Sequence, residues 1–197
     1  MSQVINLRTY IRAPNAATLV LMDLHQEQAA PPRMPADDLE PALANCRAAL
    51  RQARQYGFPV AFARLLPPAE RDNVATPITR WIGGVSPTRA DMIFDRDKPS
   101  CYASPEFSDV IAQRGHHFVL AGLSGEGACL ATVIDACHRG HKVTFLADAS
   151  ASHALGELRG DQTHRVVTDL IALYGTVTTT AEWIAACTRD ASTAMRR

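Results

Sequence analysis

The residues of this chain most suited to chemistry follow a short apolar run, 118–121, that is typical of a buried strand. The run ends in a turn with three glycines, Gly122, Gly125 and Gly127, where the lack of Cβ atoms lets backbone N–H groups converge. The first N–H groups of the helix predicted to follow point into the same turn, with the positive end of the helix dipole. The turn therefore predicts a site for an anion, or for an oxygen that becomes negative during a reaction.

Four other side chains could act at this turn. Asp23 ends the apolar run 18–22, and a carboxylate at a strand end is partly desolvated, which suits acid or base catalysis. Lys98 could tether that carboxylate, although a lysine among charged neighbours is more often a solvated surface group. Cys129 lies near the predicted helix start, where the dipole activates a thiol, yet a cysteine among small apolar residues is most often part of a core. His25 could face either a pocket or solvent.

Strand and helix patterns alternate along the chain. Strands are predicted at 18–22, 58–63, 91–95, 117–121, 142–147 and 176–178, and helices at 39–56, 104–113, 127–139, 161–173 and 180–187. The alternation predicts an α/β fold, a doubly wound and mainly parallel sheet with helices on both faces. Because sites in such sheets form at the carboxyl ends of the strands, we expect Asp23, Lys98 and the glycine turn at one edge. The long connection 65–89 is typical of a lid or a binding loop.

Composition narrows the function further. A length of 197 residues fits a single domain over 1–197. The formal net charge is zero and no basic stripe stands out, so we expect no nucleic-acid partner, and no apolar run is long enough to predict a membrane span. Five cysteines without a CxxC pair indicate reduced thiols in the cytoplasm. The histidines show no ligand spacing and the glycines do not match a dinucleotide loop, so we expect no metal and no cofactor.

Several blocks, in this order, closely resemble the isochorismatase-like hydrolases, a superfamily that includes nicotinamidases, N-carbamoylsarcosine amidohydrolases and isochorismatases. The blocks are Leu19–Asp23, Lys98–Phe107, Val119–Ser124, Leu130–Ala136, Arg139–Val143 and Ala147–Ser152. The resemblance runs from about Thr18 to about Trp183, nearly the whole chain. It implies a three-layer, Rossmann-type fold around a six-stranded parallel sheet, and an Asp–Lys–Cys triad in which Asp23 transfers protons and Lys98 is its partner.

The same resemblance implies the surroundings of the triad. A cis peptide bond between Leu123 and Ser124 would shape the turn that holds the oxyanion, together with Ala128. Trp81 and Tyr102 would line the substrate pocket, and neighbouring chains of a homodimer or homotetramer would close it. The histidine-rich metal site of nicotinamidases has no counterpart between His25 and His116, which argues against nicotinamide as the substrate.

The resemblance breaks at the nucleophile. Aligned without a gap, the catalytic cysteine of the family falls on Ala128, and Cys129 stands one residue later. One residue is about 100° of rotation on a helix, so a thiol at 129 would turn away from a pocket that 128 faces. Either a local bulge brings Cys129 into the site, or the site has no thiol nucleophile and Asp23 acts as general acid on an enol ether, as in isochorismatases.

We therefore expect a hydrolase of a small molecule, cleaving an amide-type C–N bond with Asp23, Lys98 and Cys129. The alternatives are a cysteine-independent vinyl-ether hydrolase and an inactive relative that binds a small molecule without turning it over. An unrelated doubly wound protein that binds phosphate at the glycine turn is a further alternative.

Overall fold

A computed structural model describes residues 17–29, 34, 36–66 and 80–194 of the chain. Within these ranges six strands form one sheet, in the order β3-β2-β1-β4-β5-β6, and each neighbouring pair is parallel. The strands are β1 (Thr18–Met22), β2 (Val60–Leu65), β3 (Met92–Arg96), β4 (His117–Gly122), β5 (Lys142–Ser150) and β6 (Thr176–Thr178). The predicted six-stranded parallel sheet is confirmed.

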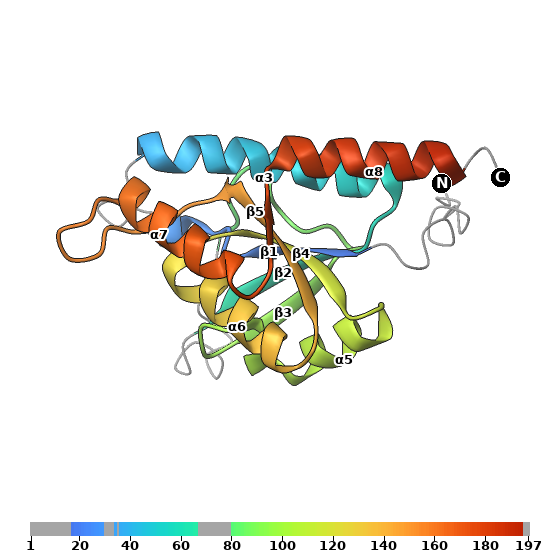
Figure 1. The fold of residues 1–197 in the computed structure, drawn as a ribbon, viewed down its shortest axis with the longest axis horizontal. Helices are drawn as coiled ribbons and strands as arrows, with labels where there is room; N and C mark the ends of the chain where they lie inside the picture. Colours follow the sequence, from blue (N-terminus) through green and yellow to red (C-terminus); the bar gives the residue numbers. More distant parts are fainter. Residues whose placement is uncertain (1–16, 30–33, 35, 67–79, 195–197) are drawn as a thin grey trace.

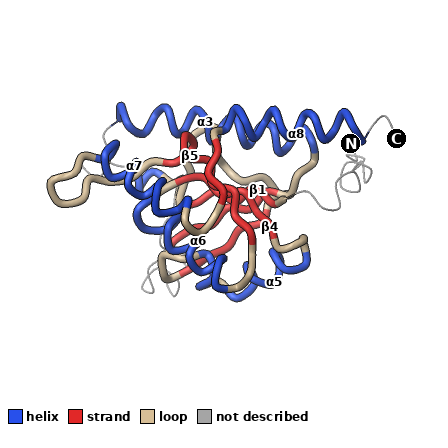
Figure 2. The backbone as a smooth tube through the Cα atoms, in the orientation of Figure 1, coloured by secondary structure: helices blue, strands red, loops and turns tan. Residues whose placement is uncertain are grey.

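Helices cover both faces of the sheet, which gives the predicted three layers (Figures 1 and 2). One face carries α3 (Ala36–Tyr56) and α8 (Thr180–Ala194), the two long helices at the top of Figure 1. The other face carries α5 (Pro105–Gln113), α6 (Leu130–His138) and α7 (Gly160–Ala172). Three short helical turns lie at loop positions: α2 (Gln26–Ala29), η1 (Cys101–Ala103) and η2 (Gly125–Cys129).

The central strand β1 divides the core into two parts. Successive side chains of a strand point to opposite faces, so Leu19 and Leu21 pack in the cluster beneath α3 and α8, while Val20 and Met22 pack in the cluster beneath α5, α6 and α7. All five residues of the strand are buried. This two-sided burial is expected for a central strand of a parallel sheet, and it explains why the sequence shows an unbroken apolar run there.

Some predicted boundaries were wrong. The second strand begins at Val60 rather than at Phe58, because the N–H of Phe58 donates to Ala53 C=O and closes the end of α3. The last helix continues past residue 187 to Ala194. Of the predicted connection 65–89, residues 67–79 lie outside the described part of the chain. Among the helices of the described ranges, none has the length and apolarity needed to cross a membrane.

Gly122 joins the glycine turn to the end of β1. Its φ is +115°, and a Cβ atom placed there would lie 2.3 Å from the carbonyl oxygen of Met22. The N–H of Leu123 donates to this same carbonyl over 2.9 Å. Glycine is therefore required at this position both by backbone conformation and by space, and its presence sets the turn directly beside the residue that follows Met22.

We predict that Gly122→Ala lowers the free energy of unfolding by on the order of 3 kcal/mol or more, because the methyl group would displace the β1 backbone. Gly140→Ala is the matched control: its φ is also positive, at +71°, but its Cβ would meet nothing within 4 Å. The control should cost about 1–2 kcal/mol, the price of the backbone conformation alone. Urea denaturation measures both, and equal losses would contradict the steric explanation.

Candidate functional site

Asp23 lies at the carboxyl end of the central strand, where the chain turns sharply. Its φ is +48°, a conformation that aspartate tolerates better than most residues, and its side chain is almost fully buried. The Oδ1 atom accepts a hydrogen bond of 2.8 Å from the N–H of Leu65, at the end of the neighbouring strand β2. The carboxylate is therefore held by backbone from the adjacent strand, at the edge where the sequence predicted a site.

The charge partner of this carboxylate is Arg96, not Lys98. The Nη2 of Arg96 forms an ion pair with Asp23 Oδ2, and the arginine side chain has no solvent exposure. Its Nη1 donates over 2.7 Å to the backbone carbonyl of Lys98. The lysine itself is exposed and forms no ion pair with Asp23. The predicted pairing of Asp23 with Lys98 is thus wrong.

The alternation of β3 explains this correction. Phe94 and Arg96 are buried, whereas the residues between and beside them are not, so Arg96 is the last inward-facing position of the strand. Asp95 faces the other way and pairs with Arg64. Lys98 stands two residues beyond the strand end, in a segment that has already left the sheet. The sequence carried only a partial signal, since Arg96 continues the alternation from Phe94 but the predicted strand 91–95 ended one residue before it.

The glycine turn has the predicted cis peptide bond between Leu123 and Ser124. The chain then enters η2, a single π-helical turn in which Cys129 N–H donates to Ser124 C=O over 3.0 Å. Gly125 N–H donates to Ala151 C=O and fastens the turn to the segment after β5. A π turn carries one more residue than an α turn, so the local bulge considered from the sequence is present.

The bulge does not expose the thiol of Cys129. The side chain has no solvent-accessible surface, and its Sγ lies 3.8 Å from the carbonyl oxygen of Gly122. Burial raises the pKa of this thiol well above its ordinary value, and the negative charges of Asp23 and Glu126 act in the same direction. The thiolate is the reactive form of cysteine, so this environment suits a core residue and not a nucleophile.

Sequence reasoning missed a carboxylate–histidine pair at the turn. Glu126 Oε1 lies 2.7 Å from His153 Nδ1, and Glu126 Oε2 accepts the backbone N–H of His153 over 3.2 Å. Burial alone would raise the pKa of Glu126, but hydrogen bonds from His153, from its own N–H and from Ser124 outweigh burial and lower it. The signal was weak, because the two residues are 27 positions apart and follow different strands.

The two predicted pocket aromatics separate in the structure. Trp81 lies beside the Asp23 turn: its ring meets the His25 ring edge-on at 6.4 Å, and its backbone bridges that of His25. Tyr102 instead packs on Phe107, and its hydroxyl lies 2.7 Å from the Nδ1 of His141, just before β5 begins. His141 stands at the amino edge of the sheet, opposite the end that carries Asp23, and a place for Tyr102 in a substrate pocket stays a prediction.

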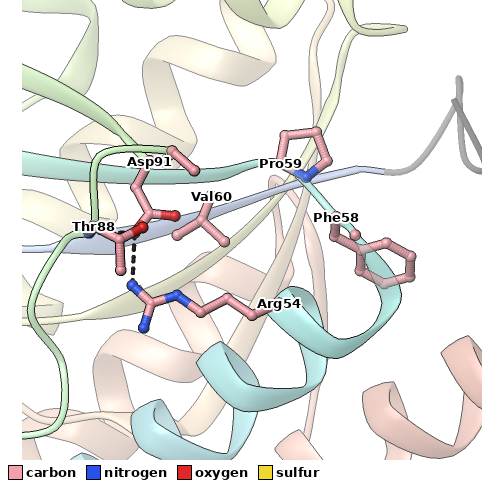
Figure 3. A pocket seen from close by; sticks show the side chains of 8 residues that line it. Arg54, Phe58, Pro59, Val60, Thr88 and Asp91 are labelled. Carbon is pink, nitrogen blue, oxygen red and sulfur yellow. Dashed lines mark hydrogen bonds and ion pairs between the residues drawn. The ribbon is translucent and has the colours of Figure 1, made fainter. Parts of the chain in front are cut away.

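Figure 3 shows a hollow, of about 160 Å³, whose lining does not include Asp23. It is lined by Phe58, by Val60 at the start of β2, and by Arg54, which pairs with Asp91 over 2.6 Å. These residues belong to the amino edge of the sheet, opposite the strand ends that carry Asp23. Within the described ranges, no group of three or more histidine, cysteine, aspartate or glutamate side chains is arranged to hold a metal ion.

Comparisons with known proteins agree with this geometry. Residues 17–182 match the family model of the isochorismatase domain. The fold is similar to a crystal structure of an isochorismatase from Pseudomonas putida, with 21% identity, 86% of this chain and 90% of that chain covered, and a TM-score of 0.75. It is also similar to a cysteine hydrolase from Pseudomonas syringae pv. phaseolicola, with 21% identity, 98% and 100% covered, and a TM-score of 0.77. A search of curated proteins gave no match.

We predict that Arg96→Met destabilises the protein by about 3–5 kcal/mol, because it leaves the buried Asp23 carboxylate without its counter-charge. Lys98→Met, at the exposed position, should change stability by less than about 0.5 kcal/mol. Thermal and urea unfolding of the two variants provide the comparison. A larger effect at Lys98 than at Arg96 would contradict the assignment of the partner.

A second prediction concerns Glu126, whose pKa is lowered from 4.5 in the folded protein. A lowered carboxyl pKa stabilises the fold above the unfolded value, and this contribution disappears as the pH falls through the folded value. Glu126→Gln should therefore lose about 1–2 kcal/mol at pH 7, with a difference from the wild type that narrows below pH 4.5. Exposed Glu157→Gln serves as the control, and a pH-independent loss at Glu126 would contradict the prediction.

Proposed function

Because the chain belongs to the isochorismatase family of hydrolases, as its match over residues 17–182 establishes, we propose that it hydrolyses an amide-type C–N bond in a small molecule. Asp23 serves as the base in this proposal, and water rather than a cysteine serves as the nucleophile. The site described above supplies a carboxylate, a fixed positive charge beside it, and a turn of backbone donors on the neighbouring strand.

One observation carries the choice of water as the nucleophile: the thiol of Cys129 is sealed in the core while Ala128 stands before it at the helix start. Four of the five cysteines are buried, and the exposed one, Cys137, lies in the last turn of α6, far along the chain from the helix start. α6 runs from the carboxyl edge of the sheet toward the amino edge, so Cys137 stands at the wrong end. The described cysteines thus offer no thiol to a substrate at Asp23.

The Asp23–Arg96 pair supports a base rather than an acid at rest. Both oxygens of Asp23 accept hydrogen bonds, Oδ1 from Leu65 N–H and Oδ2 from Arg96, and the ionised carboxylate is the acceptor-only form of this group. Two of the roughly four acceptor positions of a carboxylate are then occupied, so others remain for a water molecule. Asp23 takes a proton from this water as its oxygen attacks the substrate carbonyl carbon.

The glycine turn supports the second half of the reaction. Attack converts the carbonyl oxygen to an oxyanion, and the helix-terminal N–H groups of Gly127 and Ala128 are suited to bind it. When the C–N bond breaks, the electron pair stays on nitrogen, and the proton held by Asp23 passes to the leaving amine. Amide and water thus become carboxylic acid and amine, and Asp23 returns to its ionised form.

A vinyl-ether hydrolase is the second candidate, favoured by the small side chain of Ala128 at the position where the family places its thiol. In that reaction Asp23 would have to be protonated first, since it must donate a proton to the enol carbon before water attacks. Because Asp23 accepts hydrogen bonds from Leu65 N–H and from Arg96 at its two oxygens, as an ionised carboxylate does, we place this candidate second.

We predict that Cys129→Ala retains kcat/KM within about fivefold on any substrate found in a panel of carboxamides, N-carbamoyl compounds and enol ethers, whereas Asp23→Asn loses about 10²–10⁴-fold. Cys101→Ala is the matched control, since Cys101 is equally buried in the same cluster. Loss of activity in Cys129→Ala alone would restore the thiol mechanism. Turnover of enol ethers but not of amides would instead favour the vinyl-ether hydrolase.

Alkylation gives a readout that needs no substrate. Iodoacetamide should modify exposed Cys137 in the native protein and leave Cys129 unmodified until the chain is unfolded, as followed by peptide mass spectrometry. Rapid native modification of Cys129 would contradict its burial and with it the proposed role of water.

A further inference from the structure

Resting on the proposed function, we infer that His25 and Glu27 form a proton relay between the buried Asp23 and solvent. His25 acts through Asp23 and so is a positioning residue of the reaction. The inference starts from a burial problem. Asp23 must take up and release protons in each catalytic cycle, yet its side chain is only 3% exposed.

The three side chains form a line from the interior to the surface. The Nε2 atom of His25 lies 3.7 Å from Asp23 Oδ1, and its Nδ1 lies 3.3 Å from Glu27 Oε2. His25 is itself 3% exposed, whereas Glu27 is 56% exposed. Of these three side chains, only the imidazole lies next to both the buried carboxylate of Asp23 and the exposed carboxylate of Glu27.

The backbone fixes the ring in this position. The N–H of His25 donates to Asp23 C=O over 2.8 Å, which closes the sharp turn after β1. On the other side, Gln26 N–H donates to Arg80 C=O and Ile82 N–H donates to Leu24 C=O, so residues 80–82 run beside the turn. The Trp81 ring packs edge-on against the imidazole of His25. A surface histidine would need none of these restraints.

The hydrogen-bond chemistry of the ring shows where a proton is missing. An ionised carboxylate only accepts hydrogen bonds, so in a neutral His25 ring the close contact with Glu27 places the proton on Nδ1. Nε2 then presents a lone pair toward Asp23, and this buried atom has no hydrogen-bond partner within the described residues. Two acceptors face each other across 3.7 Å, and a single proton placed between them would satisfy both.

The other charges around His25 are consistent with this role. Arg96 faces the far oxygen of Asp23 from β3, and Arg64 lies over the Trp81 ring, 5.9 Å from its centroid, while paired with Asp95. Neither cation contacts the imidazole directly, and the two carboxylates of the line flank it on its own segment. Between the attack of water and C–N cleavage, the proton held by Asp23 can thus exchange along this line: it passes to His25 Nε2 while the Nδ1 proton passes to Glu27 and solvent, and a proton must return to Asp23 before the amine leaves. The reverse path returns a proton to Asp23.

The kinetic test uses His25→Gln and Glu27→Gln, assayed on the substrate identified by the panel. His25→Gln should lower kcat at least about tenfold and alter the shape of the pH–kcat profile. Glu27→Gln, at an exposed position that does not endanger folding, should give a smaller loss of kcat in the same direction. Added imidazole should partly restore His25→Ala. Exposed His138→Gln is the control and should match the wild type.

The outcomes separate this inference from the proposed function. Wild-type rate and pH profile in both His25→Gln and Glu27→Gln, with Asp23→Asn inactive, would overturn the relay and leave the hydrolase intact. If wild type hydrolyses nothing in the panel, the proposed function fails and ¹⁵N NMR of the His25 ring decides the relay. A neutral ring protonated at Nδ1, with that preference lost in Glu27→Gln, supports it; protonation at Nε2 overturns it.

Discussion

The buried ion pair between Asp23 and Arg96 is the interaction on which the rest of the site depends. Taking two charges out of water is costly, and the cost is offset only when the geometry satisfies both groups. Here the carboxylate also accepts the N–H of Leu65, and the guanidinium also donates to the carbonyl of Lys98. The ends of β1, β2 and β3 are thereby fastened together by one charged cluster. Neighbouring parallel strands end at the same edge, which is why the pair can form across 73 positions of sequence.

The glycine turn, on the other side of β1, is shaped by steric space and backbone conformation rather than by charge. Gly122 allows the turn to approach the Met22 carbonyl, and the π-helical entry of the next helix turns its first residues by an amount that an α-helix would not. As a result, the small side chain of Ala128 lies at the helix start, and the thiol of Cys129 is buried against the sheet. The same local geometry that gathers backbone donors also buries the thiol of Cys129, which is why we propose water as the nucleophile.

Two carboxylate–histidine pairs flank the central carboxylate. Glu126 and His153 connect the glycine turn to the segment after β5, and His25 and Glu27 connect the Asp23 turn to solvent. In each pair a partly or fully buried imidazole is oriented through Nδ1 by a carboxylate, which fixes its tautomer. The first pair mainly holds the glycine turn in place, since Glu126 also accepts a hydrogen bond from the backbone N–H of His153. The second lies between Asp23 and the surface.

Much of this protein follows from its sequence alone. The unbroken apolar run of β1 has only one stable environment, the middle of a parallel sheet, and the alternation of strands and helices then places the strand ends together. The cis peptide bond was implied instead by the resemblance to the isochorismatase-like hydrolases. The pattern of apolar runs and glycines located Asp23 and the glycine turn. Periodicity and local chemistry decide these features because each depends on residues close together in the chain.

The partner of Asp23, the position of the thiol and the true surroundings of Tyr102 were decided by tertiary structure. Arg96 and Lys98 are two positions apart and would share one face of an extended strand, so they were separated only by where β3 ends. In the same way, the extra residue of the π-helical turn η2 sets the direction of the Cys129 side chain. Local pattern specifies the kind of element, whereas the direction of a single side chain is set by the packing of distant elements around it.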